Sequence, residues 1–199
     1  MIDENFDFEI SIKYFTTSEW FIEKFKPTTM KSVLTPEEAD ILILDPKSLR
    51  IENQYHSSYV FCIDLPIDGC RAVISKEYIV EYFNMIDRMQ SDEYFVGMAD
   101  YSDVMRVSYG RLLHYGSYEL DVSKDTLYAD LPQELTEKNV GIIIFLSKKD
   151  CRLLKRIAED IDLMYTNALI TLMLPAQESQ LTESFLEVYI FQSYVDDRL

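Results

Sequence analysis

Short apolar runs, each about the length of a strand, constrain the fold of this chain more than any other feature of its sequence. "DILILD" at 40–45, "NVGIIIFL" at 139–146 and "NALITLML" at 167–174 are flanked by polar or turn-forming residues. Continuous apolar runs of about four to eight residues are typical of strands buried within a sheet. None approaches the roughly 20 residues that a helix needs to cross a bilayer. With a further strand expected at 185–195, the pattern predicts a mixed sheet packed with helices, an α/β (α+β) fold.

Amphipathic segments between these runs predict two long helices. The first is expected at 76–89 behind Ser75 as its N-cap, and the second at 148–164. In both, apolar residues recur every three or four positions, which places them on one helical face. The residues expected to face the core are Ile79, Tyr82, Phe83, Ile86 and Met89 in the first helix, and Leu153, Leu154, Ile157, Ile161 and Met164 in the second.

Two further helices are expected from capping residues and pattern. A short helix at 19–26 follows Thr17 or Ser18, either of which can cap it. A longer one is expected from about Tyr101 to Tyr115, since apolar residues there fit a helical period. Its residues expected to face the core are Val104, Met105, Tyr109, Leu112 and Leu113.

The spacing of the strands predicts two hairpins. Segments 57–66 and 71–75 are separated by Asp68-Gly69, a dipeptide that favours tight turns. The strands expected at 167–174 and 185–195 should pair with each other through the long polar loop at 175–184.

The charge balance excludes some classes of partner. The chain has 35 acidic and 19 basic side chains and a net charge of −16, so it repels phosphate backbones and anionic lipid. We expect neither nucleic acid nor the membrane as a partner. Solubility is the simplest explanation of the charge, and a basic protein partner is compatible with it.

Cysteine usage and the start of the sequence indicate a cytoplasmic protein. Cys62, Cys70 and Cys151 show no Cys-x-x-Cys spacing and stand among apolar residues, so we expect buried free thiols in a reducing compartment. The first ten residues are acidic and do not resemble a secretory leader.

Motifs for common chemistries are absent from the sequence. The five glycines are too far apart for a phosphate-binding loop. His56 and His114 have no cysteine or acid at metal-ligand spacing, and structural roles are expected for both. His114 is expected late in the helix that begins near Tyr101. No serine lies in a Gly-x-Ser-x-Gly motif. We therefore expect no cofactor, no metal site and no enzyme activity.

Asp100 and Asp103 are the remaining candidate site residues. They lie in "GMADYSDVM" (97–105), directly before the helix expected from Tyr101. Asp100 can cap that helix, and Asp103 stands where the acid of a capping box belongs. Helix capping alone explains both carboxylates.

The surrounding sequence adds a resemblance. "GMADYSDVMRVSYG" at 97–110, the β-α-β order of 139–174 and "ESFLEVYIFQSYV" at 183–195 resemble the C-terminal half of the bacterial tubulin relative FtsZ. That family has a loop of pattern Asn-x-Asp-Phe-x-Asp-Val before a helix with glycines near its end, and then a strand that opens with a glycine. The matching residues here are Asp100, Tyr101 in place of phenylalanine, Asp103, Val104, Gly110, Gly116 and Gly141.

The resemblance implies a filament contact and not nucleotide binding. In the family, the aspartates of this loop reach the GTP of the next subunit and position the attacking water. Here Met98 replaces the loop asparagine, and the glycine-rich GTP-binding loop has no counterpart in the first 96 residues. We therefore expect no GTP binding by the family's mode.

The resemblance divides the chain into a divergent α/β region at 1–96, for which it suggests a reduced nucleotide-type domain, and an FtsZ/tubulin C-terminal-like domain at 97–199. It implies a protein partner, either a full-length FtsZ/tubulin-like GTPase or a second copy of this chain. The interaction loop would contain Asp100, Tyr101 and Asp103. One alternative is an acidic module, of the immunity or phage-encoded type, that neutralises a basic protein. A second is an unrecognised enzyme that uses Asp100, Asp103 and Tyr101.

Overall fold

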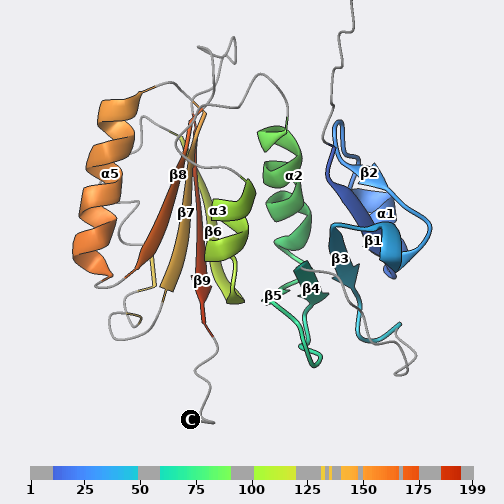
Figure 1. Ribbon diagram of the computed structural model, residues 1–199. Helices are drawn as coiled ribbons and strands as arrows, with labels where there is room; N and C mark the ends of the chain where they lie inside the picture. Colours follow the sequence, from blue (N-terminus) through green and yellow to red (C-terminus); the bar gives the residue numbers. More distant parts are fainter. Residues whose placement is uncertain are drawn as a thin grey trace, which may run out of the picture.

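The fold is built on one mixed sheet. The computed structural model describes residues 11–48, 59–90, 101–119, 131–132, 135, 140–147, 150–165, 168–174 and 185–193. Within them, nine strands follow the order β2-β1-β3-β4-β5-β6-β9-β7-β8 (Figure 1). Neighbouring strands are parallel except that β9 is antiparallel to both β6 and β7. The expected α/β class with a mixed sheet is confirmed.

Helices and strands are interspersed along the chain. Those before residue 91 are β1 (Lys13–Thr16), α1 (Glu19–Lys24), β2 (Lys31–Ser32), the 3₁₀ turn η1 (Pro36–Glu38), β3 (Ile41–Leu44), β4 (Tyr59–Ile63), β5 (Ala72–Ile74) and α2 (Ile79–Met89). Those after residue 100 are α3 (Tyr101–Val107), β6 (Gly110–Glu119), β7 (Val140–Leu146), α5 (Cys151–Met164), β8 (Leu169–Met173) and β9 (Phe185–Gln192).

Several expectations are confirmed in detail. Every residue of β3 and β7 is buried, as the apolar runs predict. Ser18 caps α1 by accepting a hydrogen bond from the Phe21 N–H at 3.3 Å. All five residues expected on the inner face of α2 are buried. In α5, Leu154, Ile157 and Ile161 are buried, and Leu153 and Met164 pack against them.

The helix expected from Tyr101 to Tyr115 is wrong in its second half. The helix ends at Val107, and β6 begins at Gly110. Gly110 adopts a φ of +94°, which side-chain-bearing residues rarely reach, and a Cβ there would collide with the Gln192 carbonyl of β9. From Gly110 to Leu113 burial alternates residue by residue, so Leu112 is buried and Leu113 is exposed. Gly116 and His114 therefore lie in a strand.

The hairpin expected at Asp68-Gly69 is also wrong, because β4 and β5 pair in parallel. The connection turns more than once, with positive φ at Asp64 and at Gly69, and Cys70 N–H bonds to the Ile67 carbonyl at 3.1 Å. The chain thus returns to the start of β4 before β5 begins, and the Arg71 N–H reaches the Val60 carbonyl at 2.8 Å.

The hairpin expected between β8 and β9 does not form. Strand β8 pairs in parallel with β7, whereas β9 lies between β7 and β6. Six consecutive residues of β9 are buried. A strand that is apolar on both faces needs neighbours on both edges and cover on both sides, and the edge of a sheet does not provide them.

Three smaller expectations need correction. Ser75 does not cap α2, since α2 starts at Ile79 and the buried Ser75 hydroxyl has no hydrogen-bond partner among the described residues. The cysteines are free thiols, but only Cys62 is buried, and Cys151 is exposed. His56, Asp100 and the expected domain boundary near 96 lie outside the described residues, so the two-domain division stays a prediction.

Helices cover both faces of the C-terminal strands. Ile143 and Phe145 of β7 belong to the core cluster that also contains buried residues of α1, α2 and α3. Ile142 and Ile144, on the opposite face of the same strand, pack with Leu154 and Ile161 of α5. Figure 1 shows α5 on one side of these strands and α3 on the other.

A buried carboxylate connects α2 to the loop between α1 and β2. Asp87 is 5% exposed and accepts hydrogen bonds from the Thr28, Thr29 and Met30 N–H groups at 2.7–2.9 Å. The Thr28 and Thr29 hydroxyls also donate to it at 2.8 Å. Burial pushes the pKa of Asp87 up, but these backbone and hydroxyl donors outweigh that effect and hold the pKa below its ordinary value.

We expect Asp87→Asn to destabilise the protein by about 3 kcal/mol at neutral pH, because an amide places donors against backbone N–H groups. A carboxyl with a lowered folded pKa stabilises above its unfolded pKa and loses that contribution as the pH falls through the folded value. The gap between wild type and variant should therefore shrink below about pH 4. Urea unfolding across pH measures it, with the exposed Asp162→Asn as the matched control. An unchanged midpoint for Asp87→Asn would contradict the assignment.

Candidate functional site

The structure places two of the three predicted loop residues at the start of α3. Asp103 is half-buried in the first turn, and Asp100 lies outside the described residues. Tyr101 packs inward, with its ring edge-on to Tyr59 at a centroid distance of 5.6 Å. Its hydroxyl is buried and has no hydrogen-bond partner in the described part of the chain. Burial, assisted by the nearby Tyr82 and Tyr59, raises the pKa of Tyr101, so this phenol stays protonated.

Arg71 holds the last turn of α3. Its Nε donates to the Met105 carbonyl at 2.8 Å, and Nη2 donates to the same oxygen. The guanidinium also lies over the rings of Tyr59, at 5.2 Å, and Tyr109, at 5.9 Å. The last carbonyls of a helix lack partners within the helix, and a cation there is favoured by the helix dipole. Arg71 therefore fixes this short helix from the side of β5.

A buried hydroxyl chain fixes α3 to α2. The Tyr82 hydroxyl and Ser108 Oγ are 2.6 Å apart, and Ser108 Oγ donates to the Val104 carbonyl at 2.8 Å. On the β7 side, Gly141 lets the backbone approach closely, since a Cβ there would collide with the Val107 carbonyl. A seven-residue helix is only marginally stable by itself, so these tertiary contacts position it.

The outer side of α3 carries exposed residues. Ser102 and Arg106 are exposed, and Asp103 lies between them in sequence. Tyr101 belongs to the inner side, so the predicted loop residues do not all face the same way. The arrangement places the exposed Arg106 guanidinium and the half-buried Asp103 carboxylate on a helix that is held in place.

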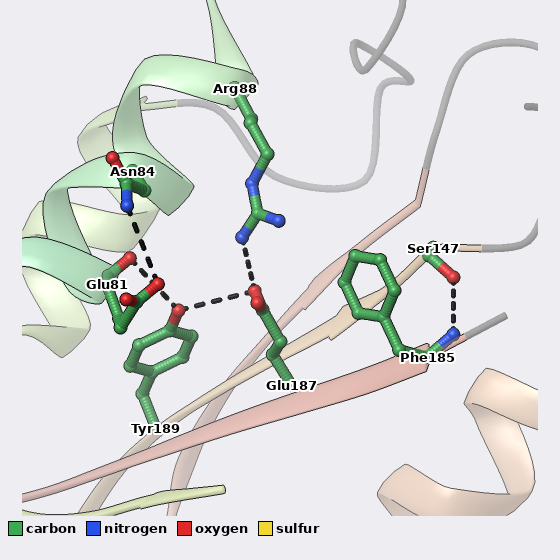
Figure 2. Close-up of polar contacts among 7 residues, drawn as sticks. All are labelled: Glu81, Asn84, Arg88, Ser147, Phe185, Glu187 and Tyr189. Atoms are coloured by element: carbon green, nitrogen blue, oxygen red, sulfur yellow. Dashed lines mark hydrogen bonds and ion pairs between the residues drawn. The ribbon is translucent and has the colours of Figure 1, made fainter. Parts of the chain in front are cut away.

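A second polar cluster connects α2 to β9, and sequence reasoning missed it. Arg88 Nη2 lies 2.5 Å from Glu187 Oε2. The Tyr189 hydroxyl lies 3.3 Å from both Glu187 Oε2 and the Glu81 carbonyl (Figure 2). The Arg88 guanidinium also lies over the Phe145 ring at 4.9 Å. One signal was available in the sequence: Glu187 is the single acid within the apolar run of β9.

Glu187 is a costly residue for a strand interior. It is 5% exposed, and this burial raises its pKa above the ordinary value, although the adjacent Arg88 acts in the opposite direction. The side chains of Asn84 and Glu81 are 3.5 Å apart; Glu81 is exposed and Asn84 is half-buried (Figure 2). The cluster is therefore an ion pair between the buried Glu187 and the partly exposed Arg88, and it positions α2 over β9.

The carboxyl ends of β1 and β3 are where parallel α/β sheets commonly bind ligands. Here the backbone N–H groups are used within the chain: Thr17 bonds to the Ile43 carbonyl at 3.3 Å, and Asp45 to the Thr17 hydroxyl at 3.0 Å. The Ser18 N–H bonds to the Thr16 hydroxyl at 3.1 Å. These donors are not available to a phosphate group in this arrangement.

The described residues contain no cluster of three or more histidine, cysteine or acidic side chains that could hold a metal ion. None of the helices in this part of the chain has the length and apolar character that a membrane crossing requires.

We expect Arg88→Met to cost about 3 kcal/mol at neutral pH, because it leaves a buried carboxylate without its cation. A raised folded pKa means that the stability linked to Glu187 is present at low pH and is lost as the pH rises through that pKa. The cost should therefore be smaller near about pH 4 than near about pH 8.

The double variant Arg88→Met/Glu187→Gln should recover part of the loss at the higher pH. Urea unfolding of wild type, both single variants and the double variant measures the coupling. An equal loss at both pH values, without recovery in the double variant, would show that packing and not charge governs this position.

No protein-family model matches the chain, and no curated protein matches it in sequence. Among solved structures it is similar to FtsZ of M. jannaschii. An empty FtsZ dimer gives a TM-score of 0.48 at 12% identity over 78% of this chain and 64% of that one, which is less than two thirds of its length. A tryptophan-to-tyrosine mutant of FtsZ gives 0.53 at 10% identity over 92% of this chain and 91% of that one. At such identities the likeness is one of fold: the chain has an FtsZ-like fold over most of its length.

Proposed function

We propose that this chain is a non-GTPase, FtsZ/tubulin-like protein that acts by protein–protein contact in a cell-division-type filament. It would cap or regulate the filament of an FtsZ/tubulin-like GTPase, or join an assembly as a subunit. The observation that carries the proposal is a firmly held α3 with an exposed outer side, in a chain whose fold is FtsZ-like.

The contacts around α3 favour a recognition role. Arg71, Tyr82 and Ser108 fix the helix from its inner side, so little conformational entropy is lost when its outer side meets a partner. Asp103 and Arg106 supply both signs of charge on a short segment, which can set orientation and register.

The ends of β1 and β3 support a role without nucleotide hydrolysis. Nucleotide-binding folds leave backbone N–H groups pointing at the phosphates. Here the N–H groups of Thr17, Ser18 and Asp45 donate within the chain. With Met98 in place of the loop asparagine, we propose that docking blocks filament growth and does not trigger hydrolysis.

The net charge of −16 favours a second candidate, an acidic module that neutralises a basic protein. Such binding depends on long-range attraction, and its association rate falls steeply with salt. A contact centred on α3, with both charge signs, depends less on salt.

The test of the filament role is sedimentation and GTP turnover of an FtsZ from the same organism, with and without this chain. We expect less pelleted polymer and lower turnover at substoichiometric ratios. Asp103→Ala should weaken the effect about tenfold, equal to about 1.4 kcal/mol of contact energy, and Asp100→Ala should also weaken it.

Asp162→Ala, on the exposed side of α5, removes the same charge far from α3 and should leave the effect unchanged. Circular dichroism and urea unfolding confirm that each variant is folded. Full-length filaments and unchanged turnover at every ratio would refute the filament role, and binding of a basic protein at low salt would then favour the acidic module.

A further inference from the structure

Two cysteines meet on the face of the sheet that lies opposite α1 and α2. Cys62 is in β4, and Cys70 ends the connection between β4 and β5. Both belong to a small cluster with Leu42, Val60 and Val73. They are eight positions apart in sequence, and the turns at Asp64 and Gly69 bring them together.

The two cysteine side chains lie in one small cluster and interact with each other. The side chains of Cys62 and Cys70 are hydrogen-bonded to each other. The Cys70 thiol also lies 3.0 Å from the Ala72 carbonyl, to which it donates. Both cysteines pack into the same small cluster, and a disulfide requires that their Cα atoms lie within about 7 Å of each other.

The two thiols differ in their exposure to solvent. Cys62 is fully buried, whereas Cys70 is partly exposed and follows Asp68 and Gly69, which are exposed. The hydrogen bond from Cys62 lowers the pKa of Cys70, although burial opposes this, and the pKa of Cys62 is raised. A reagent in solution therefore meets Cys70 first, and the more accessible thiol is also the one that ionises more readily.

We propose that Cys62 and Cys70 form a redox-active dithiol that closes to an intramolecular disulfide when a peroxide or a small disulfide reacts with Cys70. With oxidised glutathione, the Cys70 thiolate attacks one sulfur, a Cys70–glutathione disulfide forms, and one glutathione thiolate leaves. Cys62 then loses its proton to water and attacks the Cys70 sulfur, and the second glutathione thiolate leaves. Both cysteines are oxidised, and one glutathione disulfide is reduced to two thiols.

With hydrogen peroxide, the Cys70 thiolate attacks oxygen to give a sulfenic acid and hydroxide. Cys62 then displaces the sulfenic hydroxyl, which leaves as water after it takes up a proton. Both routes end in the same bond. This inference is independent of the proposed filament role, since it depends only on the two thiols and the loop between them.

The sequence allows a direct assay. Arg50 and Arg71 flank both cysteines, so trypsin releases them on one peptide, 51–71, and Asp64 and Asp68 lie between them. In the full chain carrying Cys151→Ser, treatment with oxidised glutathione should remove both thiols together. Peptide 51–71 should lose two hydrogen masses and keep no glutathione. Cleavage before the aspartates should leave the two cysteine fragments joined until a reductant is added.

Two single variants separate the roles of the thiols. In Cys62→Ala, Cys70 should retain one glutathione, because no second thiol displaces it. In Cys70→Ser, Cys62 should react at least about tenfold more slowly than Cys70 does. The assay on Cys151→Ser alone stays decisive if a buried variant fails to fold. Stable glutathione on Cys70, two thiols that persist, or Cys62 reacting equally fast without Cys70 would each overturn the proposal.

Discussion

The arrangement of this protein depends on the contacts that two residues in the last turn of α2 make with distant parts of the sheet. Asp87 points one way, to the backbone donors of Thr28, Thr29 and Met30 beside β2. Its neighbour Arg88 points the other way, to Glu187 in β9. Two consecutive residues thus connect the first strands of the chain to β9, its last strand. Because a buried charge is tolerated only with its partners in place, these contacts allow α2 little freedom to shift along the sheet.

The elements that sequence reasoning predicted correctly are those that depend on local pattern. The apolar runs of β3 and β7, the Ser18 cap and the inner faces of α2 and α5 each need only a few neighbouring residues to be recognised. Strand pairing failed because the partner is distant in sequence. Nothing near 185–192 shows that this strand enters between β6 and β7 and not beside β8. The segment from Gly110 failed because its apolar spacing fits a short helix as well as a strand.

In the candidate site too, sequence reasoning identified what depends on local pattern and missed the contacts between residues far apart in sequence. Asp103 was predicted from a motif, and its position in the first turn of α3 agrees with helix capping; its contact role remains a prediction. The residues that fix the helix were not predicted, because Arg71 and Met105 are 34 positions apart. The pair Arg88 and Glu187, 99 positions apart, could not be foreseen either, although one acid in an apolar strand indicates a buried partner. The turn at Gly69 was indicated by the sequence, but the positive φ at Asp64, which also shapes the connection between Cys62 and Cys70, was not.

The place of β9 in the sheet sets an order of events during synthesis. It is the last strand of the sheet in chain order, yet it lies between β6 and β7. Until residues 185–192 leave the ribosome, β6 and the apolar β7 each carry an open edge, because the strand that joins them is missing. At about 5–20 residues per second, the stretch between β7 and β9 takes seconds to synthesise. Open edges of this kind template aggregation, so a ribosome that stalls between β7 and β9 would hold the nascent chain in its most aggregation-prone form.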